Sequence, residues 1–492
     1  MNFASIRFGE HSAEIEVAED PELFEHGYYD HAGWVNGALH NRMFLFLGTK
    51  GTGKSTIAQK ILLGRSFDCF PQLTDLSEFP FSNFYTAAFQ GGTGRERTIP
   101  DSWVWLILLS FLFSLEKDPG RLANDQFDAL IAGLRKVGFG PPERFDDLLI
   151  QTRDRKSVFS GPSFDLESIF GVEASVTTFS YERQSSAKKD IAIHRLVSYA
   201  KSVLLNQQSG SKHILMFDGL DRALLGDATA LQSIAALIST ASALNQEFRR
   251  QCSPCKVLVF CRTELFEKLD VYNANSIRQT YALELAWYDN RRNVRTSHLV
   301  RLANLRAELS LGGNVDIFKE FFEEEVGISG KYRLTAIWIL FHTRNTPRDF
   351  LRALTYIQRY TRDLGGKISA KELIAGLTDY SREYFVNEIR DELRGYISAE
   401  NMQHTMQVLI NMRSNKFETD QFLDAMKNLG ANGDLSMEIL RALFACSAIG
   451  NLFRAGDGEM RPVSKHYSHT ARFDPAATII VHRGLWKAFN YV

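Results

Sequence analysis

The chain has 492 residues, of which 45% are apolar and 23% charged, and this composition excludes a collagen-like or wholly disordered protein. At roughly 150 residues per domain, this length predicts two to four domains. The 57 Lys and Arg against 58 Asp and Glu leave a formal charge of -1, so a nucleic-acid site would need a local basic patch. Five scattered Cys exclude a disulfide framework and indicate a reducing compartment.

The N-terminal region shows no signal-peptide pattern. From Glu10 to Asp30 the chain carries eight acidic residues and no Lys or Arg, so we expect a solvated segment packed on the rest of the protein. The longest apolar run, Trp103 to Leu115, has 13 residues, whereas a bilayer crossing takes roughly 17 to 25. We therefore expect a buried helix capped by Asp101 or Ser102, no membrane contact, and a cytoplasmic protein.

A glycine-rich loop between an apolar strand and a helix carries the strongest chemical signal. Arg42 to Leu47 is the predicted strand, Gly48 to Ser55 matches G-x-x-x-x-G-K-[ST], and a helical pattern follows. Glycines let successive backbone N–H groups surround phosphate oxygens at the positive end of the following helix. The residues expected to contact a nucleotide are Gly48, Thr49, Lys50, Gly51, Thr52, Gly53, Lys54, Ser55 and Thr56.

Two residues at the start of that helix have separate predicted roles. Lys54 reaches the β and γ phosphates as a point charge, and Ser55 offers its hydroxyl to Mg²⁺. No N-K-x-D element follows the third predicted strand, which disfavours GTP, so the predicted ligands are ATP and Mg²⁺. The alternative is a strand-helix turn that binds nothing.

Strands and helices alternate after residue 190, which predicts a parallel α/β sheet. The strand His213 to Phe217 ends at Asp218, whose carboxylate at the carboxyl end of a parallel strand can hold the water shell of Mg²⁺. Gly219 then stands where a water-activating Glu would be expected. Asp221 is the nearest substitute base, and the alternative is that it caps the next helix.

Two Arg are predicted to act on the nucleotide. Arg262 follows the strand Lys256 to Phe260, where a guanidinium can bind the γ-phosphate bidentately, or can instead pair with a surface carboxylate. Thr346 and Pro347 predict a helix start, as its cap and first turn, from which Arg348 would lean over the nucleotide as part of a lid. The predicted catalytic residues are Lys54, Asp218, Asp221, Arg262 and Arg348.

A stretch rich in Arg is the best local candidate for contact with a DNA backbone. It contains five Arg and no acidic residue. The alternatives are a solvated helix face or a surface between subunits. Its members are Arg291, Arg292, Arg295, Arg301 and Arg306.

The order of predicted elements divides the chain into four regions. We expect an acidic segment at 1–40, a P-loop core at 41–290 with a helical insert near 119–189, a helical lid at 291–400 and a winged-helix-like domain at 401–492. Beyond the strand Tyr281 to Leu285 the pattern is helical to about Met426. The winged helix is predicted from a helix at 436–446, a Gly-rich hairpin at 450–458, a strand at 478–482 and a closing helix at 485–489.

Taken together, the motifs resemble the additional-strand P-loop ATPases, on the AAA-like and STAND side of that group. The resemblance extends to a bacterial family with a G-x-K-G-[ST]-G-K-S phosphate loop and a C-terminal V-H-x-G-L-W-K-A-like segment, here Gly48 to Ser55 and Val481 to Ala488. It implies an α/β fold: a parallel-sheet P-loop NTPase core with helical insert, helical lid and C-terminal winged helix. It also implies that the strand ending at Phe260 lies between the other two motif strands, and that Arg262 senses the γ-phosphate.

Three functions stay open at this point. Because such ATPases are often encoded beside bacterial anti-phage effectors, the resemblance implies an ATP-hydrolysing switch that regulates a partner effector or self-association. The second is a DNA-binding initiator or loader controlled by ATP, and the third is a scaffold that binds ATP without hydrolysing it. The Gly after Asp218 departs from the pattern of fast-hydrolysing members, which favours slow turnover.

Overall fold

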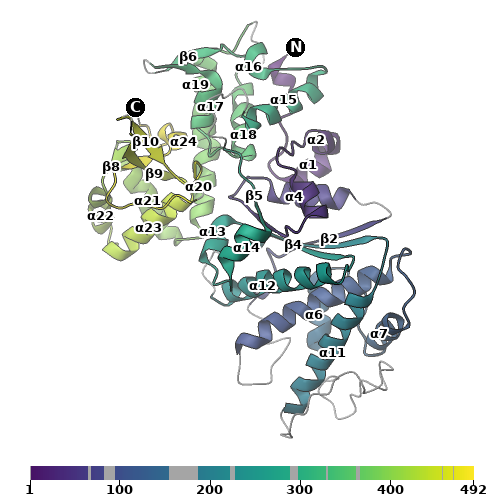
Figure 1. The fold of residues 1–492 in the computed structure, drawn as a ribbon. Helices are drawn as coiled ribbons and strands as arrows, with labels where there is room; N and C mark the ends of the chain where they lie inside the picture. Colours follow the sequence, from purple (N-terminus) through teal and green to yellow (C-terminus); the bar gives the residue numbers. More distant parts are fainter. Residues whose placement is uncertain are drawn as a thin grey trace.

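The fold comprises a sheet core and a largely helical C-terminal half (Figure 1). A computed structural model describes residues 2–64, 68–81, 95–154, 187–221, 228–288, 297–328, 331–361, 366–456, 458–468 and 470–491. In the view of Figure 1 the sheet lies between the long helices α6, α11 and α12 below it and helices α15 to α20 above it.

The core is a five-stranded parallel sheet with the order β2-β3-β4-β1-β5. Its strands are β1 (Leu45–Leu47), β2 (Cys69–Asp75), β3 (Lys212–Asp218), β4 (Cys255–Cys261) and β5 (Ala282–Glu284). The predicted position of β4, between the strand of the phosphate loop and the strand ending in Asp218, is confirmed. Because the strands are parallel, the residues that follow β1, β3 and β4 lie along one edge of the sheet.

Helices cover the sheet and bury its apolar strands. They are α3 (Trp34–His40), α4 (Lys54–Leu63), α6 (Arg95–Glu116), α7 (Asp125–Lys136), α8 (Phe145–Asp154), α11 (Ala187–Asn206), α12 (Ala228–Arg250), α13 (Thr263–Lys268) and α14 (Ala274–Tyr281). Helices α7 and α8 form the described part of the predicted helical insert, of which residues 155–186 lie outside the described residues. Strand β2 was not predicted, since its exposed and buried positions do not alternate and Pro71 interrupts its pattern.

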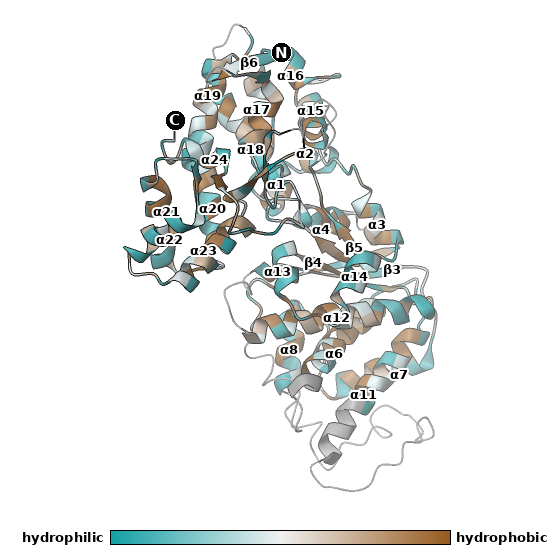
Figure 2. Cartoon of the chain, turned by 60° about the vertical axis from the view of Figure 1, so that its left-hand side comes forward, coloured by the Kyte–Doolittle hydropathy of each residue, from teal (hydrophilic) through white to brown (hydrophobic). Residues whose placement is uncertain are grey.

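Helix α6 is the buried apolar helix that the sequence predicts, but the predicted cap at Asp101 or Ser102 is wrong, because the helix already begins at Arg95. Its segment Ile99–Glu116 is long and apolar enough to cross a membrane by composition, but 78% of it is buried inside the protein. The Trp103 indole donates a 2.9 Å hydrogen bond to the carbonyl of Ser233 in α12, and Trp105 donates one of 3.2 Å to Thr152 in α8. Figure 2 shows α6 beside α8 and α12, with brown segments that mark its hydrophobic residues. The helix is therefore part of the core, and the indole N–H groups of its two Trp are hydrogen-bonded.

The C-terminal half starts with helices and ends in a small sheet. The helices and the hairpin after the core are α15 (His298–Leu311), α16 (Ile317–Glu320), β6 (Glu325–Ile328), β7 (Lys331–Leu334), α17 (Thr335–Phe341), α18 (Pro347–Gln358), α19 (Ala370–Asp379), a π-helical segment (Tyr380–Phe385) and α20 (Val386–Leu393). The prediction of continuous helix to Met426 is wrong at the β6–β7 hairpin, whose antiparallel pairing depends on a turn that helical periodicity does not detect.

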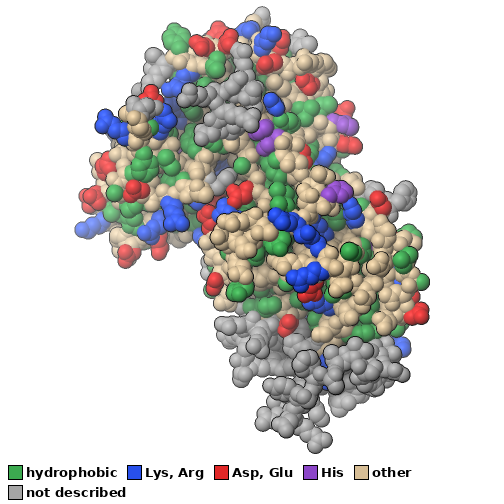
Figure 3. All heavy atoms as spheres, in the orientation of Figure 1, with side chains coloured by type: hydrophobic (Ala, Val, Ile, Leu, Met, Phe, Trp, Pro, Cys, Tyr) green, Lys and Arg blue, Asp and Glu red, His purple; other side chains and the backbone are tan. Residues whose placement is uncertain are grey.

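The last region consists of α21 (Ala399–Asn411), β8 (Lys416–Phe417), α22 (Thr419–Lys427), α23 (Gly433–Ala445), β9 (Ile449–Arg454), β10 (Met460–Val463), β11 (Ile479–Val481) and α24 (Arg483–Trp486). Its four strands form a second sheet with the order β10-β9-β11-β8. The expected hairpin near 450–458 is present as β9 and β10. Lys and Arg side chains lie among Asp and Glu over the molecular face shown in Figure 3.

The acidic N-terminal segment is fastened to α15 by a buried ion pair. Its helices are a short 3₁₀ turn (Phe3–Ser5), α1 (Ala13–Glu19) and α2 (Pro21–His26). Arg306 donates to Glu16 at 2.7 and 2.8 Å and to the carbonyl of Phe8 at 2.6 Å. The expectation that Arg306 contacts DNA is therefore wrong, because its guanidinium is buried and paired. Arg301 is exposed, and Arg291, Arg292 and Arg295 lie outside the described residues.

Replacing Glu16 with Ala should destabilise the fold strongly. It leaves the Arg306 charge buried without its carboxylate partner, a change that typically costs about 3 to 5 kcal/mol. Glu14 lies in the same helix and is exposed, so Glu14→Ala is the matched control. We expect a clear fall in melting temperature for Glu16→Ala alone. Equal melting temperatures for the two variants would contradict the role of this pair.

Candidate nucleotide-binding site

The loop between β1 and α4 has the backbone geometry of a phosphate cradle. Gly51 and Gly53 adopt positive φ angles of 84° and 97°, a region that residues with side chains rarely adopt. A Cβ atom at Gly48 would lie 2.4 Å from the hydroxyl oxygen of Thr52, which itself donates to the carbonyl of Thr49 at 2.9 Å. The glycines at these positions are thus required by the turn, and the loop fits a group that binds to backbone N–H donors.

Lys54 lies at the first position of α4 and is buried under the loop. Its ammonium donates to the carbonyls of Gly48 at 2.9 Å and Thr49 at 3.0 Å. Burial lowers the pKa of Lys54, and the charges of Asp221, Glu264 and Asp218 oppose that shift. A cation held at this point, close enough to three carboxylates to feel their charge, can bind the negative charge of a polyphosphate.

Asp218 and Ser55 lie together at the end of β3. Burial raises the pKa of Asp218, and hydrogen bonds from Ser55 and the backbone of Gly219 oppose that shift. A hydroxyl beside a carboxylate suits Mg²⁺, which binds proteins through one or two oxygen ligands and takes the rest from water and phosphate. The described residues contain no cluster of three or more His, Cys, Asp or Glu that could hold a metal ion. Ser55 and Asp218 are the residues that would hold Mg²⁺ together with a nucleotide.

Arg262 follows β4 directly, as predicted, and is held by carboxylates on both sides. Its guanidinium lies 2.5 Å from Asp221 and 4.0 Å from Glu392 of α20. Burial disfavours the charged form, but Asp221 and Glu392 together raise the pKa of Arg262. The Nε atom is buried without a hydrogen-bond partner among the described residues. The structure therefore places Asp221 in the site as the ion-pair partner of Arg262.

The helices beyond the core touch the phosphate loop. Thr346 caps α18 and Pro347 occupies its first turn, as the sequence predicts. The backbone N–H of Arg348 lies 3.4 Å from the carbonyl of Gly51. Lys50 of the loop pairs with Glu388 of α20 at 2.9 Å, and this contact lowers the pKa of Glu388 against the effect of its burial. The role of the Arg348 side chain toward a nucleotide stays a prediction.

A buried group of charges behind Arg262 was missed by sequence reasoning. Arg344 pairs with Asp349 at 2.8 Å and with Glu392 at 2.5 Å. Glu392 thus lies between Arg344 and Arg262, and it connects the C-terminal helices to the end of β4. These residues come from separate elements and belong to no local motif. The only available signal was the position of Arg344 just ahead of the Thr346-Pro347 helix start.

Glu264 is a further residue that the sequence did not reveal. It lies in the first turn of α13, two positions after Arg262, and only 6% of its surface is exposed. Neither carboxylate oxygen has a hydrogen-bond partner in the described part of the chain. Burial, reinforced by Glu392, raises the pKa of Glu264 to about 7. Acidic residues are common in the first turn of a helix, so the sequence gives no reason to single out Glu264. Its burial at the site is visible only in the folded structure.

Comparison with known proteins adds little to this geometry. No protein-family model matches the chain, and no curated protein sequence matches it. Among solved structures the chain is similar to a Walker-type ATPase of Pyrococcus abyssi, at 11% sequence identity and a TM-score of 0.37, covering 90% of this chain and 95% of that chain. A similarity this distant supports no conclusion about the present chain. The P-loop assignment follows instead from the strand order and the geometry of the glycine-rich loop.

Replacing Arg262 with Ala should affect the binding of ATP but not that of ADP. A guanidinium that contacts only the γ-phosphate leaves ADP affinity nearly unchanged, whereas its loss weakens ATP affinity or slows hydrolysis by at least ~10-fold, about 1.4 kcal/mol. Equilibrium binding of both nucleotides measures this, with Arg278→Ala in α14 as the control, since that Arg pairs with Glu284 and Glu267. Equal losses for ATP and ADP would show instead that Arg262 only stabilises the fold.

Proposed function

We propose that this protein is a molecular switch that binds ATP with Mg²⁺ and hydrolyses it slowly. The observation that carries the proposal is the position of β4 between β1 and β3, since it brings Lys54, Asp218 and Arg262 to one edge of the sheet. In open parallel sheets, ligands bind outside the carboxyl ends of the strands. The glycine geometry of the loop and the Ser55–Asp218 contact support the same site.

Each residue of the site has a distinct role in this proposal. Lys54 leaves its loop carbonyls to neutralise the β and γ phosphates, and Ser55 and Asp218 hold Mg²⁺. Arg262 exchanges part of its contact with Asp221 and Glu392 for the γ-phosphate, which is a charge-assisted contact that ADP cannot make. A contact made in only one nucleotide state is what shifts a conformational equilibrium.

We propose that the C-terminal half changes its conformation with the nucleotide state. We propose that residues 401–492 form a winged-helix domain, because a helix, a short strand and two helices precede the β9–β10 hairpin and β11. This domain packs on the helical segment beside α20: Ser381 donates to the carbonyl of Gly484 at 2.5 Å. Closure or release of these helices would then control a partner effector or self-association. A bacterial defence-type setting is the one that the family resemblance implies.

Replacing Lys54 with Ala tests this function directly. We expect loss of ATP binding and turnover, because the variant removes the cation aimed at the β and γ phosphates. Lys60→Ala is the matched control, since Lys60 lies in the same helix and donates instead to the carbonyl of Glu25. Circular dichroism should show both variants folded. Normal ATP affinity and turnover in Lys54→Ala would refute the phosphate-loop assignment.

The ATPase rate with and without duplex DNA separates the proposed switch from a DNA-controlled loader. We expect slow turnover that DNA does not change, since Arg306 of the predicted basic stretch is buried and pairs with Glu16 of the N-terminal segment. Stimulation by DNA would favour the loader. Tight ATP binding with no turnover would favour a scaffold.

A further inference from the structure

Glu264 is the buried ionisable group of the nucleotide edge that the proposed function leaves unused. It stands on α13 immediately beyond β4, and β4 is the strand flanked by the phosphate-loop strand and the Asp218 strand. Its charge acts on Lys54 and on Arg262, and each of these residues lowers the pKa of Glu264 in return. The carboxylate therefore belongs to the same edge as the predicted phosphate contacts.

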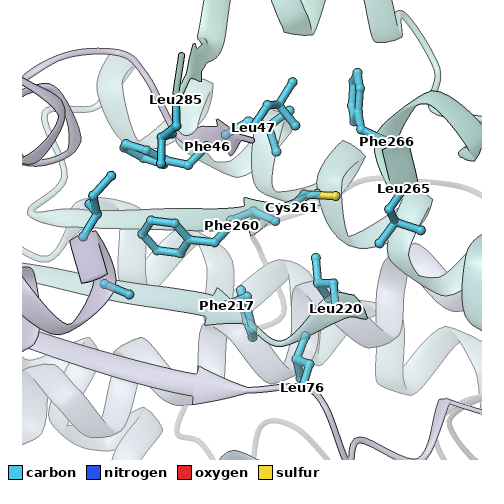
Figure 4. Packing of buried hydrophobic residues seen from close by; sticks show 14 of the residues in the cluster. Phe46, Leu47, Leu76, Phe217, Leu220, Phe260, Cys261, Leu265, Phe266 and Leu285 are labelled. Atoms are coloured by element: carbon cyan, nitrogen blue, oxygen red, sulfur yellow. The ribbon is translucent and has the colours of Figure 1, made fainter. Parts of the chain in front are cut away.

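The surroundings of Glu264 do not satisfy it. Both oxygens are buried and have no hydrogen-bond partner on another residue within the described part of the chain. Figure 4 shows the neighbouring apolar side chains Leu265 and Phe266 of α13 and Cys261 at the end of β4. An unpaired buried carboxylate is costly, and structures that keep one generally use it. Stability therefore does not explain this residue.

The other carboxylates near this edge are already engaged. Asp221 lies 2.5 Å from the guanidinium of Arg262, and Glu392 lies 2.5 Å from that of Arg344. Asp218 is hydrogen-bonded to Ser55, the pair suited to Mg²⁺. Each of these three carboxylates therefore already has a partner on another residue. Among the four carboxylates, Glu264 alone has no such partner in the described part of the chain.

We propose that Glu264 is the catalytic base of ATP hydrolysis, taking the place of the Glu that is missing after Asp218. This inference rests on the proposed function and deepens it. A carboxylate of Glu264 accepts a proton from water while the water oxygen bonds to the γ-phosphorus. The bond from the γ-phosphorus to the bridging oxygen breaks, and its electron pair leaves with ADP. Glu264 then passes the proton to solvent, which completes the conversion of ATP and water to ADP and phosphate.

The groups that face Glu264 set the pH at which it can act. Burial and Glu392 of α20 raise its pKa, and Arg262 and Lys54 lower it, leaving a pKa of about 7. A base with this pKa is about half ionised at neutral pH, so it can both accept and release a proton there. Further residues whose pKa is affected by the charge of Glu264 are Cys261, Lys268, Tyr396 and Cys446.

The Glu264→Gln variant tests the proposal in the full chain. We expect ATP affinity within about threefold of the parent and a hydrolysis rate at least ~100-fold lower, since general-base catalysis typically contributes 10²- to 10⁴-fold. Glu267→Gln is the matched control: Glu267 lies in the same helix, pairs with Lys465 at 3.0 Å, and should leave the rate unchanged. Because Gln removes an unpaired buried charge, Glu264→Gln should melt no lower than the parent at pH 8.

The pH dependence gives a second readout that a structural role would not produce. Since the base must be deprotonated and kcat/KM reports the unliganded protein, kcat/KM should rise with pH and level off above about 7. Glu264→Asp keeps a carboxylate on a shorter side chain and should retain this pH dependence at a reduced rate. Glu264→Gln should lose the rise through pH 7 in its residual activity.

Each result is decisive. A parent protein that neither binds nor hydrolyses ATP refutes the proposed function itself. A parent that binds ATP without hydrolysing it refutes the role of Glu264 while keeping the nucleotide site. Parental turnover in Glu264→Gln, or equal loss of binding and turnover, also refutes the role of Glu264. Retained binding with lost turnover, together with the predicted pH profile, supports it.

Discussion

The carboxylate of Glu392 holds two buried guanidinium groups, that of Arg262 at the end of β4 and that of Arg344 ahead of α18. These ion-pair contacts connect the sheet core to the C-terminal helices. Arg344 in turn pairs with Asp349, and Lys50 of the phosphate loop pairs with Glu388, one turn before Glu392 on α20. One face of α20 therefore carries the acidic partners of two cations from the nucleotide edge.

In the proposed function this network would respond to phosphate because its contacts are replaceable. Removing one partner from a buried ion pair is costly, since the remaining charge stays out of water. A γ-phosphate would replace the negative charge of Glu392 beside Arg262, whose closer partner is Asp221. The contact on α20 would then change between nucleotide states, and Ser381 and Gly484 would transmit that change to the last domain. Allosteric coupling needs a contact that differs between two states, and the Arg262–Glu392 contact is the one that we propose to differ.

The sequence predicts those parts of the site whose residues lie in one contiguous motif. The phosphate loop, the strand ending in Asp218 and the strand before Arg262 each combine an apolar run with a polar terminus, and the structure has these elements at the predicted positions. Strand β2 and the β6–β7 hairpin escaped prediction because their pairing is not local. The sequence could not assign Glu264, Arg344 and Glu392 to the site for the same reason. Their importance depends on burial and on ion pairs between elements that only the folded chain brings together. The buried Arg306 shows the opposite error, in which a local cluster of Arg suggested a surface.

A structure of the chain with Mg²⁺ and a non-hydrolysable ATP analogue would test whether the γ-phosphate displaces Arg262 from Glu392. We expect the triphosphate in the Gly48–Ser55 loop, Lys54 withdrawn from the carbonyls of Gly48 and Thr49, and Arg262 on the γ-phosphate with a longer separation from Glu392 than 4.0 Å. An analogue bound in the loop with Arg262 still held by Asp221 and Glu392 would contradict the coupling. An analogue bound elsewhere would contradict the site.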